Sequence, residues 1–572
     1  MGETVGLPSV NSDRRHDLDA LRGFAMLLGI GLHAAMAYTL IPWPVQDVSR
    51  NELLTVFFLV VHGFRMPLFF VVSGFFTAML WKRKGTTHLL RHRLFRVLVP
   101  CLLGLLTIVP SVHWVVHWAM AKPASQATST DLKTPAARLI DAMKRGDRSG
   151  IDLTLKEPVD VNARDNSFQV PLLAWAAMCG DAETIQILLD RGANIDAVTG
   201  DGSTAAQAAV FRGYPEVLQL LKQRGAKLDV KNRDGATPSD TLLANRGLTE
   251  YIANAIGLPV RDFADIEAGR EKCRKLLPKS VRTSQIPTFL TDLEAPLKKT
   301  RAAYAAWLSS NRWQITWKTG ATPFHLVLGE FFSHLWFLWF LWWIVLLFVV
   351  TVPLLSPLLE SPLLKKAVLS PMRLLWLVPL TLLPQLWMGV LVPAFGPDTS
   401  TSIIPPPHLL TYYAIFFAFG VMYYFADDTN GIVGRRWDWN LTIALAVCFP
   451  VALMTMGNPL LTAIPQLGFT WLMIFACLGV FRRYASHPNN NIRYLSDAAY
   501  WLYLAHLPLV ITAQHLVRNW PIHSTVKFAL ICGSVTALLL GTYEYGVRYT
   551  WLGALLNGRK SRPSRTSTSH QR

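Results

Sequence analysis

Long apolar blocks and short polar connections alternate along most of the chain. Each block is about 20 residues long, the length that an α-helix needs to cross the hydrocarbon core of a bilayer. Proline and glycine occur inside several blocks, and transmembrane helices tolerate both. The pattern predicts an all-α fold, a polytopic membrane helix bundle of about ten transmembrane helices. The blocks lie approximately at residues 18–40, 53–80, 97–119, 333–355, 374–395, 408–426, 440–457, 460–481, 498–517 and 527–546.

Charged residues are scarce within these blocks and concentrated beside them. They make up 16% of the chain, against roughly 25% of an ordinary soluble domain. The formal net charge of +18 would suggest a nucleic acid partner for a soluble protein, but here the basic residues flank apolar blocks, as the positive-inside rule expects. We therefore expect these basic residues to interact with the lipid bilayer, and we expect no nucleic acid partner. The flanking residues are Arg14, Arg15, Lys82, Arg83, Lys84, Arg91, Arg93, Lys365, Lys366, Arg435, Arg436, Arg482, Arg483, Arg559, Lys560, Arg562 and Arg565.

A polar insert between the third and fourth blocks repeats itself at its centre. Gly180 recurs as Gly213, and the motif that begins at Arg191 recurs at Arg224, in both cases 33 positions later. A period of 33 residues is that of the ankyrin repeat, a helical unit that must stack on its neighbours to bury a core. The insert is therefore expected to be an α-helical ankyrin-repeat solenoid, for which we expect a protein partner.

These patterns divide the chain into five segments. Residues 1–119 carry the first three transmembrane helices, residues 120–260 form the soluble insert with ankyrin-like repeats, and residues 261–325 form a helical connector. Residues 326–548 carry the remaining transmembrane helices, and residues 549–572 form a basic cytoplasmic tail.

The basic residues also predict which connections face the cytoplasm. If the N-terminus is cytoplasmic, every second connection lies inside, and those connections carry the Lys/Arg clusters. Both termini are then cytoplasmic and the insert is extracytoplasmic. Long loops cross membranes largely regardless of their charge, although ankyrin arrays are more familiar inside cells.

The first apolar block carries three residues that are costly to place in a membrane, Asp19, Arg22 and His33. Eleven residues make three helical turns almost evenly, so Arg22 and His33 share a helix face, about 16 Å apart along the axis. Asp19 is placed to pair with Arg22. A neutral imidazole is well suited to take a proton from a hydroxyl at physiological pH. His33 is therefore the candidate catalytic residue, the alternative being a core histidine that hydrogen-bonds a neighbouring helix.

A second basic group, Arg93 and Arg96, begins the third block on the same side of the membrane. Two arginines three residues apart share a helix face, and their guanidinium groups suit phosphate oxygens. We expect Arg22, Arg93 and Arg96 to form one anion site for a phosphorylated cofactor. The alternative is that all three are ordinary positive-inside residues whose charged ends extend to the membrane surface.

Other polar or aromatic residues of the apolar blocks are candidates for lining the same cavity. His506 lies about one turn after Tyr503, although a structural hydrogen bond would explain it equally well. Ser73 could bond a carbonyl of the preceding turn, beside Gly74, which would permit close helix packing. Trp336 also suits an interfacial aromatic belt. The full set of cavity candidates is Asp19, Ser73, Trp336, Tyr503 and His506. The cysteines show no metal-ligand spacing, so no metal site is expected.

Several stretches resemble, in order, the landmarks of the membrane acyltransferase 3 family. The similarity covers essentially the whole membrane part and none of the insert. The residues from Met66 to Phe70 and from His334 to Leu338 are most similar to those of the branch that succinylates periplasmic glucans. The stretches are Asp19 to His33, with ten residues between Arg22 and His33, "FRMPLFFVVSGFF" (Phe64 to Phe76), Arg93-x-x-Arg96, "HLWFLWFL" (His334 to Leu341), "YWLYLAHLPL" (Tyr500 to Leu509) and "YEYGVRYTWLGALLNGR" (Tyr543 to Arg559).

This resemblance implies an integral membrane O-acyltransferase, multi-pass, in the inner (cytoplasmic) membrane of a bacterium. Such an enzyme transfers an acetyl, succinyl or similar group from cytoplasmic acyl-CoA to a hydroxyl of an extracytoplasmic carbohydrate. Acyl-CoA is then a donor substrate, and no cofactor is bound permanently. His33 would act as the general base or as a transient acyl carrier. Arg22, Arg93 and Arg96 would hold the phosphates of the donor.

Two functions from other classes compete with this one. A carrier for an anionic solute would use the arginines as its binding site, and it would be expected to show repeated halves with interrupted helices at matching positions. No such symmetry is visible in the sequence. A membrane-anchored ankyrin interaction protein would not need His33 or Arg22 at membrane depth.

Overall fold

A computed structural model defines the fold. It describes residues 15–39, 41, 43–47, 49–120, 134–165, 169–232, 236–242, 244, 249, 252–253, 256–259, 261–278, 288–315, 324–390, 395–456, 458–558 and 560. Among the basic residues that flank the apolar blocks, Arg14, Arg559, Arg562 and Arg565 lie outside this set, as does most of the predicted cytoplasmic tail.

The chain divides into two compact units. The membrane unit comprises Met1–Ala121 and Lys298–Arg572, and the insert unit comprises Lys122–Leu297. The predicted connector, residues 261–325, is therefore divided between the two.

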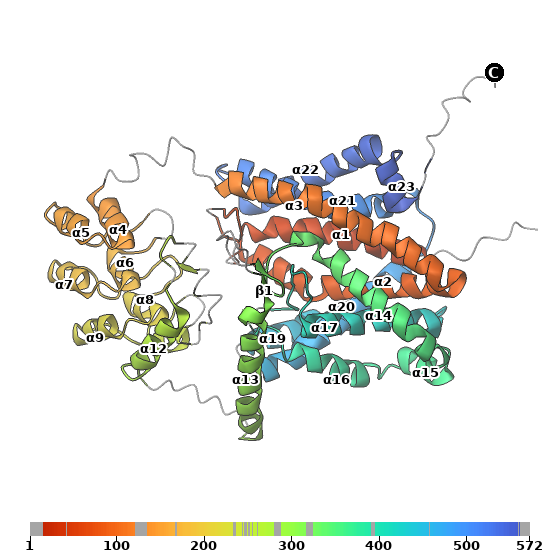
Figure 1. The fold of residues 1–572 in the computed structure, drawn as a ribbon, viewed down its shortest axis with the longest axis horizontal. Coiled ribbons are helices and arrows are strands. Elements are labelled where there is room, and N and C mark those ends of the chain that lie inside the picture. The colour runs from red at the N-terminus through yellow and green to blue at the C-terminus, as the bar shows by residue number, and fades with distance from the viewer. Residues whose placement is uncertain are drawn as a thin grey trace, which may run out of the picture. The chain divides into compact units, whose positions relative to one another are not determined.

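The membrane unit is built almost entirely from helices (Figure 1). Its elements are α1 (His16–Met36), α2 (Glu52–Arg93), the π-helical turn η1 (Leu94–Leu98), α3 (Val99–Met120), α13 (Thr288–Leu308, which begins in the insert unit), η2 (Asn311–Trp313), β1 (Gln314–Ile315), β2 (Phe324–His325), η3 (Ser333–Leu335), α14 (Trp336–Leu359), α15 (Pro362–Leu369), α16 (Leu374–Gln385), α17 (Pro407–Ala426), α18 (Trp437–Ile443), η4 (Ala444–Cys448), α19 (Phe449–Met454), α20 (Pro459–Tyr484), α21 (Asn490–Val517), α22 (Ser524–Thr542), η5 (Tyr543–Val547) and α23 (Trp551–Asn557). The strands β1 and β2 form one short antiparallel pair.

Within the described residues, seven helical runs are long and apolar enough to cross a membrane, or eight if the sharply bent pair α15–α16 counts as one span. The 69-residue run Glu52–Met120 covers two of the predicted blocks and is interrupted at Gly85, whose φ of 76° and ψ of 177° are not helical. α21 covers another predicted block and is not among the seven. Each predicted block therefore contains a helix, and the predicted all-α fold is confirmed.

α2 and α17 pack against each other through a pair of glycines. A Cβ atom on Gly74 would lie 2.0 Å from the carbonyl oxygen of Phe417, and one on Gly420 would lie 1.9 Å from that of Val71. The two helix backbones are therefore in direct contact, as small residues allow in membrane bundles. This confirms the packing role predicted for Gly74.

Replacing Gly420 with alanine should destabilise the membrane unit, because its methyl group and the backbone of α2 cannot occupy the same space. Overpacking of this kind costs about 1–3 kcal/mol, which would appear as a lower midpoint of thermal unfolding in detergent. Gly533→Ala in α22 is the matched control, since its Cβ would meet no atom within 4 Å. Equal midpoints for the two variants would contradict the close contact.

α1, which carries the predicted catalytic histidine, lies inside the bundle. It contacts α2, α20, α21 and α22 (Figure 1). Its apolar residues Leu18, Leu21 and Ile30 are buried in the main hydrophobic core. This position explains how polar side chains on α1 can meet residues from distant parts of the sequence.

The insert unit consists of short helices stacked in pairs. Its described helices are α4 (Pro135–Arg145), α5 (Arg148–Leu155), α6 (Leu172–Cys179), α7 (Ala182–Asp190), α8 (Ala205–Arg212), α9 (Pro215–Gln223), α10 (Pro238–Thr241) and α12 (Phe263–Arg274). α4, α6 and α8 each end at a glycine in the left-handed conformation, Gly146, Gly180 and Gly213. A side chain is disfavoured in that conformation, which is the physical reason that glycine recurs in the repeat.

α12 closes the described end of this stack. The guanidinium group of Arg270 donates to the carbonyl oxygen of Phe211 at 3.0 Å, and α12 contacts both α8 and α9. Burial lowers the pKa of Arg270 to about 10. The first part of the predicted connector therefore serves as a cap of the solenoid.

Candidate active site

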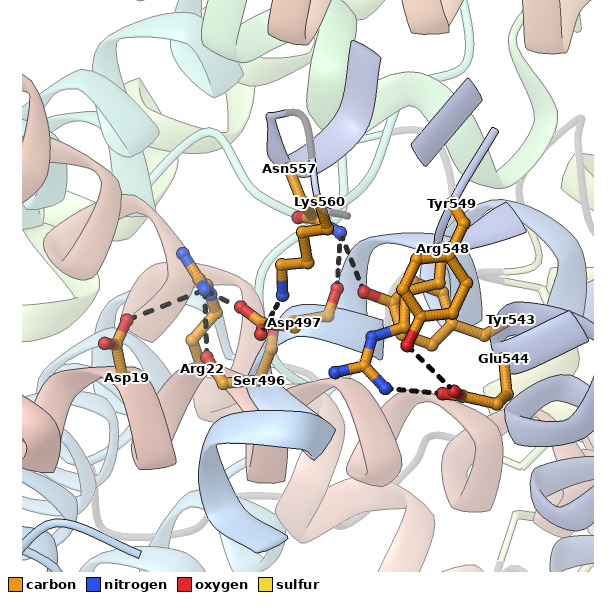
Figure 2. A network of polar contacts seen from close by, with 10 residues as sticks. All are labelled: Asp19, Arg22, Ser496, Asp497, Tyr543, Glu544, Arg548, Tyr549, Asn557 and Lys560. Atoms are coloured by element: carbon orange, nitrogen blue, oxygen red, sulfur yellow. Dashed lines mark hydrogen bonds and ion pairs between the residues drawn. The ribbon is translucent and has the colours of Figure 1, made fainter. Parts of the chain in front are cut away.

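Arg22 lies on α1 in a polar network at the start of the helix (Figure 2). Its Nη2 atom donates to the hydroxyl of Ser496 on α21 at 2.9 Å and lies 3.5 Å from the carboxylate of Asp19. The predicted pairing of Asp19 with Arg22 is thus present. The pair leaves Arg22 partly exposed, with 37% of its side chain accessible, so its charge remains available to a ligand.

Arg93 and Arg96 lie close to Arg22, and both are within electrostatic range of it. Arg93 ends α2 and donates to the hydroxyl of Thr77 at 2.6 Å, while its Nε atom is buried without a hydrogen-bond partner. Arg96 lies in η1, and its backbone carbonyl accepts from Tyr500 at 2.7 Å. Among the described residues, neither arginine has an ion pair. The structure therefore brings the three predicted arginines together, with positive charge in excess.

The π-helical turn η1 changes the relation between Arg93 and Arg96 that their spacing suggested. In an α-helix, residues three apart share a face, but a π-helical turn has i→i+5 hydrogen bonds and a different angular step. Arg93 accordingly points to Thr77 on its own helix. The guanidinium of Arg96 lies against Gly558, whose Cβ would be 2.8 Å from it.

The segment after α22 adds groups to this region that the sequence did not single out (Figure 2). Asn557 donates to the backbone carbonyl of Asp497 at 2.6 Å, and Lys560 forms an ion pair with the carboxylate of the same residue. Nearby, Arg548 pairs with Glu544 at 2.7 Å. A charged residue near the start of a mostly apolar block, as Asp497 is, was the available sequence signal.

His33 lies near the other end of α1, among other histidines. Its ring stacks on that of His506 at a centroid distance of 5.1 Å, and His506 in turn meets His334 edge to face at 5.2 Å. His62 and Arg65 also lie within electrostatic range of His33. The imidazole of His33 therefore lies among protein groups from α2, α21 and η3.

Several polar atoms of this histidine cluster (His33, His334 and His506) are buried and lack partners. They are Nδ1 of His33, Nδ1 of His334 and Nε2 of His506. Buried polar atoms are nearly always hydrogen-bonded in native structures. A set of unpartnered nitrogens in one place is what a site for a polar ligand provides.

The backbone beside His33 is held by Gln514. The side-chain amide of Gln514 donates to the carbonyl oxygen of His33 at 2.9 Å and to that of Ala34 at 3.2 Å. Trp43 donates to the other end of the same amide at 2.8 Å. These bonds satisfy carbonyls at the C-terminal end of α1 and fix the position of His33.

The remaining cavity candidates occupy different environments. Tyr503 donates to the backbone carbonyl of His334 at 2.7 Å, so it supports the histidine cluster through η3. The carbonyl of Ser73 accepts from Thr77 at 2.7 Å, and Thr77 is the residue that holds Arg93. Trp336 is 7% exposed and packs against Phe340. Whether these residues line a substrate cavity stays a prediction.

Arg65 and Gln514 are neighbours of His33 that sequence reasoning missed. Arg65 lies within the stretch from Phe64 to Phe76 that was quoted as a landmark, and a charge inside an apolar block was the signal. Gln514 is separated from His33 by 481 residues and carries no signal of its own.

Comparison with known families identifies the membrane unit. The model of the acyltransferase 3 family, described as an acyltransferase domain, matches residues 15–136 and 288–544, which is more than half of the chain. The chain belongs to the acyltransferase 3 family. It is therefore an enzyme that transfers acyl groups other than aminoacyl groups, and the family and its apolar helices identify it as a membrane protein. A model of three ankyrin repeats matches residues 139–232, so the insert belongs to the ankyrin-repeat class.

The curated relatives share one part of this acyltransferase. "Glucans biosynthesis protein C" of Salmonella typhi and that of Salmonella typhimurium are each 38% identical to it over 104 residues, which is 18% of this chain and 26% of the relative. The protein of the same name from Salmonella paratyphi B is 36% identical over the same length. The alignment thus spans about a quarter of the relatives, and it supports placing this acyltransferase near the glucan branch of the family.

Proposed function

We propose that this acyltransferase moves an acyl group from cytoplasmic acyl-CoA to a hydroxyl of an extracytoplasmic carbohydrate, with His33 as the general base. The observation that carries the proposal is the pair of sites at opposite ends of α1. A cluster of three arginines lies at one end, and a buried histidine cluster lies at the other, about 16 Å away along the helix. The relatives named for glucan biosynthesis support a carbohydrate acceptor.

The arginine cluster suits the phosphates of coenzyme A. Arg22, Arg93 and Arg96 present guanidinium groups without enough carboxylate to neutralise them, and guanidinium groups bind phosphate oxygens in a bidentate manner. The pantetheine arm of coenzyme A is a long, narrow chain. It would carry the thioester along α1 from this cytoplasmic site toward His33.

The histidine cluster suits an acceptor that carries hydroxyl groups. Nε2 of His334 lies 3.0 Å from the carbonyl oxygen of Leu504, and Nδ1 of His506 lies 2.8 Å from that of Tyr503. Because a carbonyl oxygen only accepts, these two nitrogens carry the proton in the neutral rings. The free nitrogens of both rings are then acceptors, which is what sugar hydroxyls require.

The proposed reaction is a direct acyl transfer. His33 takes the proton of the acceptor hydroxyl as its oxygen forms a bond to the thioester carbonyl carbon. The tetrahedral intermediate then collapses, the carbon–sulfur bond breaks, and the thiolate of coenzyme A takes the proton from the imidazolium. The products are the carbohydrate ester and free coenzyme A. A covalent acyl-histidine would make His33 the carrier in place of the base.

The proposal places both termini in the cytoplasm and the insert outside it, in the inner membrane of a bacterium. Val112 and Val115 near the end of α3 pack with Val45, which follows α1. α3 therefore ends on the side where the α1–α2 connection lies, and this is the extracytoplasmic side if the N-terminus is cytoplasmic. The ankyrin repeats would bind a protein partner there.

The experiment that tests this function uses the full chain in sealed vesicles, with labelled acyl-CoA enclosed on the side of the N-terminus and glucan on the other side. The expected result is labelled ester on the external glucan, together with free coenzyme A inside. Label that stays on the donor side, in the presence of correctly inserted protein, would exclude transfer across the membrane.

A further inference from the structure

Arg65 is a partly buried cation beside the proposed base that the reaction described above does not use. It lies on α2, and its guanidinium packs against the bare backbone of α1 at Gly29, one helical turn before His33. A Cβ atom on Gly29 would lie 2.2 Å from its Nη1 atom. The absence of a side chain at Gly29 is therefore what lets the guanidinium reach this position.

This guanidinium lacks an ion pair among the described residues, and its Nε atom is buried without an acceptor. The groups near Arg65 that could carry a negative charge are the phenols of Tyr413 and Tyr503. Phenols are neutral near pH 7. A charge held within a membrane protein is expensive, and such residues usually serve a function. The structure therefore leaves Arg65 ready for an oxygen atom that carries negative charge.

The side chains around Arg65 indicate which oxygen atom of the substrates it would bind. Arg65 is within electrostatic range of His33, His334 and His506. The free nitrogens of His334 and His506 are acceptors, so they suit the hydroxyl groups of the acceptor. Arg65 carries only donors, so it suits the group that these histidines cannot bind, the carbonyl oxygen of the thioester.

We propose that Arg65 is a catalytic residue that binds the thioester carbonyl oxygen and stabilises the negative charge it acquires in the tetrahedral intermediate. This inference rests on the proposed function. When the hydroxyl oxygen attacks the carbonyl carbon, the electron pair of the C=O bond moves to the carbonyl oxygen, next to the guanidinium. When the C–S bond breaks, that pair returns to form the ester carbonyl, and Arg65 is unchanged.

Four variants test this role. Arg65→Gln removes the charge, and Arg65→Lys keeps a charge of different geometry. Gly29→Ala displaces the guanidinium without altering any polar group. Gly31→Ala is its matched control, since its Cβ would meet the rings of Phe57 at 3.2 Å and Phe528 at 3.8 Å and no polar group among its nearest atoms. Thermal unfolding and gel filtration of each variant show whether it is folded.

The expected result is a fall in kcat of about 100- to 1,000-fold in Arg65→Gln, the usual loss when one oxyanion donor is removed. Gly29→Ala should lose kcat in the same direction, Arg65→Lys should retain part of it, and Gly31→Ala should match wild type. The Kd for free coenzyme A should not change. Folded Arg65→Gln and Gly29→Ala proteins with wild-type kcat would overturn the proposal.

Donors with different acyl groups distinguish oxyanion binding by Arg65 from binding of a free carboxylate of the acyl group. A loss with both acetyl-CoA and succinyl-CoA supports oxyanion binding, because both thioesters have the same carbonyl. A loss confined to succinyl-CoA would overturn it and show that Arg65 binds the free carboxylate of the acyl group. Hydrolysis of acyl-CoA by water tests the role of Arg65 separately from the proposed function. If wild-type protein hydrolyses acyl-CoA and the Arg65 variants do not, while no glucan is acylated, then glucan is refuted as the acceptor. Arg65 would still be the residue that stabilises the oxyanion.

Discussion

Replacing His33 with alanine is expected to abolish acyl transfer to glucan, while the protein should still insert into the membrane. Removing a general base typically costs about 100- to 10,000-fold in rate, and His33 is the residue that we propose as this base. His33→Gln keeps the size and a polar group of the side chain but cannot take a proton. It should therefore be as inactive as His33→Ala.

The measurement is kcat for labelled acyl-CoA with glucan as acceptor, alongside the Kd for coenzyme A. His113→Ala in α3 is the matched control, because His113 is also a histidine of a membrane helix but its side chain is exposed. The control should keep wild-type kcat, and the Kd should stay the same in all variants. Wild-type turnover by His33→Ala would remove the proposed base.

The second large effect concerns the donor. Replacing Arg93 and Arg96 together with glutamine should weaken the binding of coenzyme A, because the two guanidinium groups that we propose to bind its phosphates are lost. A hydrogen bond to a charged group contributes about 1.5–3 kcal/mol, so each substitution should raise the Kd by roughly tenfold or more. Arg91→Gln is the matched control, since Arg91 lies beside them in α2 and is exposed.

Pantetheine, which has the same thiol arm and no phosphate, shows whether the effect belongs to the phosphates. Its binding should be weak and equal in wild type and in the double variant. A double variant that binds coenzyme A as tightly as wild type would identify Arg93 and Arg96 as topology residues. An equal loss of affinity for pantetheine would indicate a damaged fold, because Arg93 also bonds Thr77.

The sequence was sufficient for the features that depend on local periodicity. Apolar blocks of membrane length predicted the helices, and the recurrence of Gly180 at Gly213 predicted the ankyrin unit that the structure and the family model both confirm. The interval from Arg22 to His33 placed both on one face of α1. These patterns are readable because the geometry of a helix is fixed by residues close together in the chain.

The same local patterns did not show where a helix departs from α-geometry. The π-helical turn at Leu94–Leu98 contains Arg96 and begins directly after Arg93, where the sequence predicted a regular α-helix. A single break at Gly85 likewise divides one 69-residue helical run into two of the predicted blocks. Neither feature follows from hydropathy, because both depend on how the flanking helices pack.

By itself, the sequence determined the helical membrane fold, the inserted repeats and the family, and it placed the candidates Arg22 and His33 on one helix. Only the tertiary structure showed that Arg65, His334 and Gln514, which come from three other parts of the chain, lie near His33 beside the expected His506. The physical reason is that helix association in a membrane is driven by close packing and interhelical hydrogen bonds, with little contribution from the hydrophobic effect. The shapes of the helix surfaces therefore decide which helices pack together, as at Gly29 and Gly420. Shape complementarity between distant helices produces no periodic pattern in the sequence.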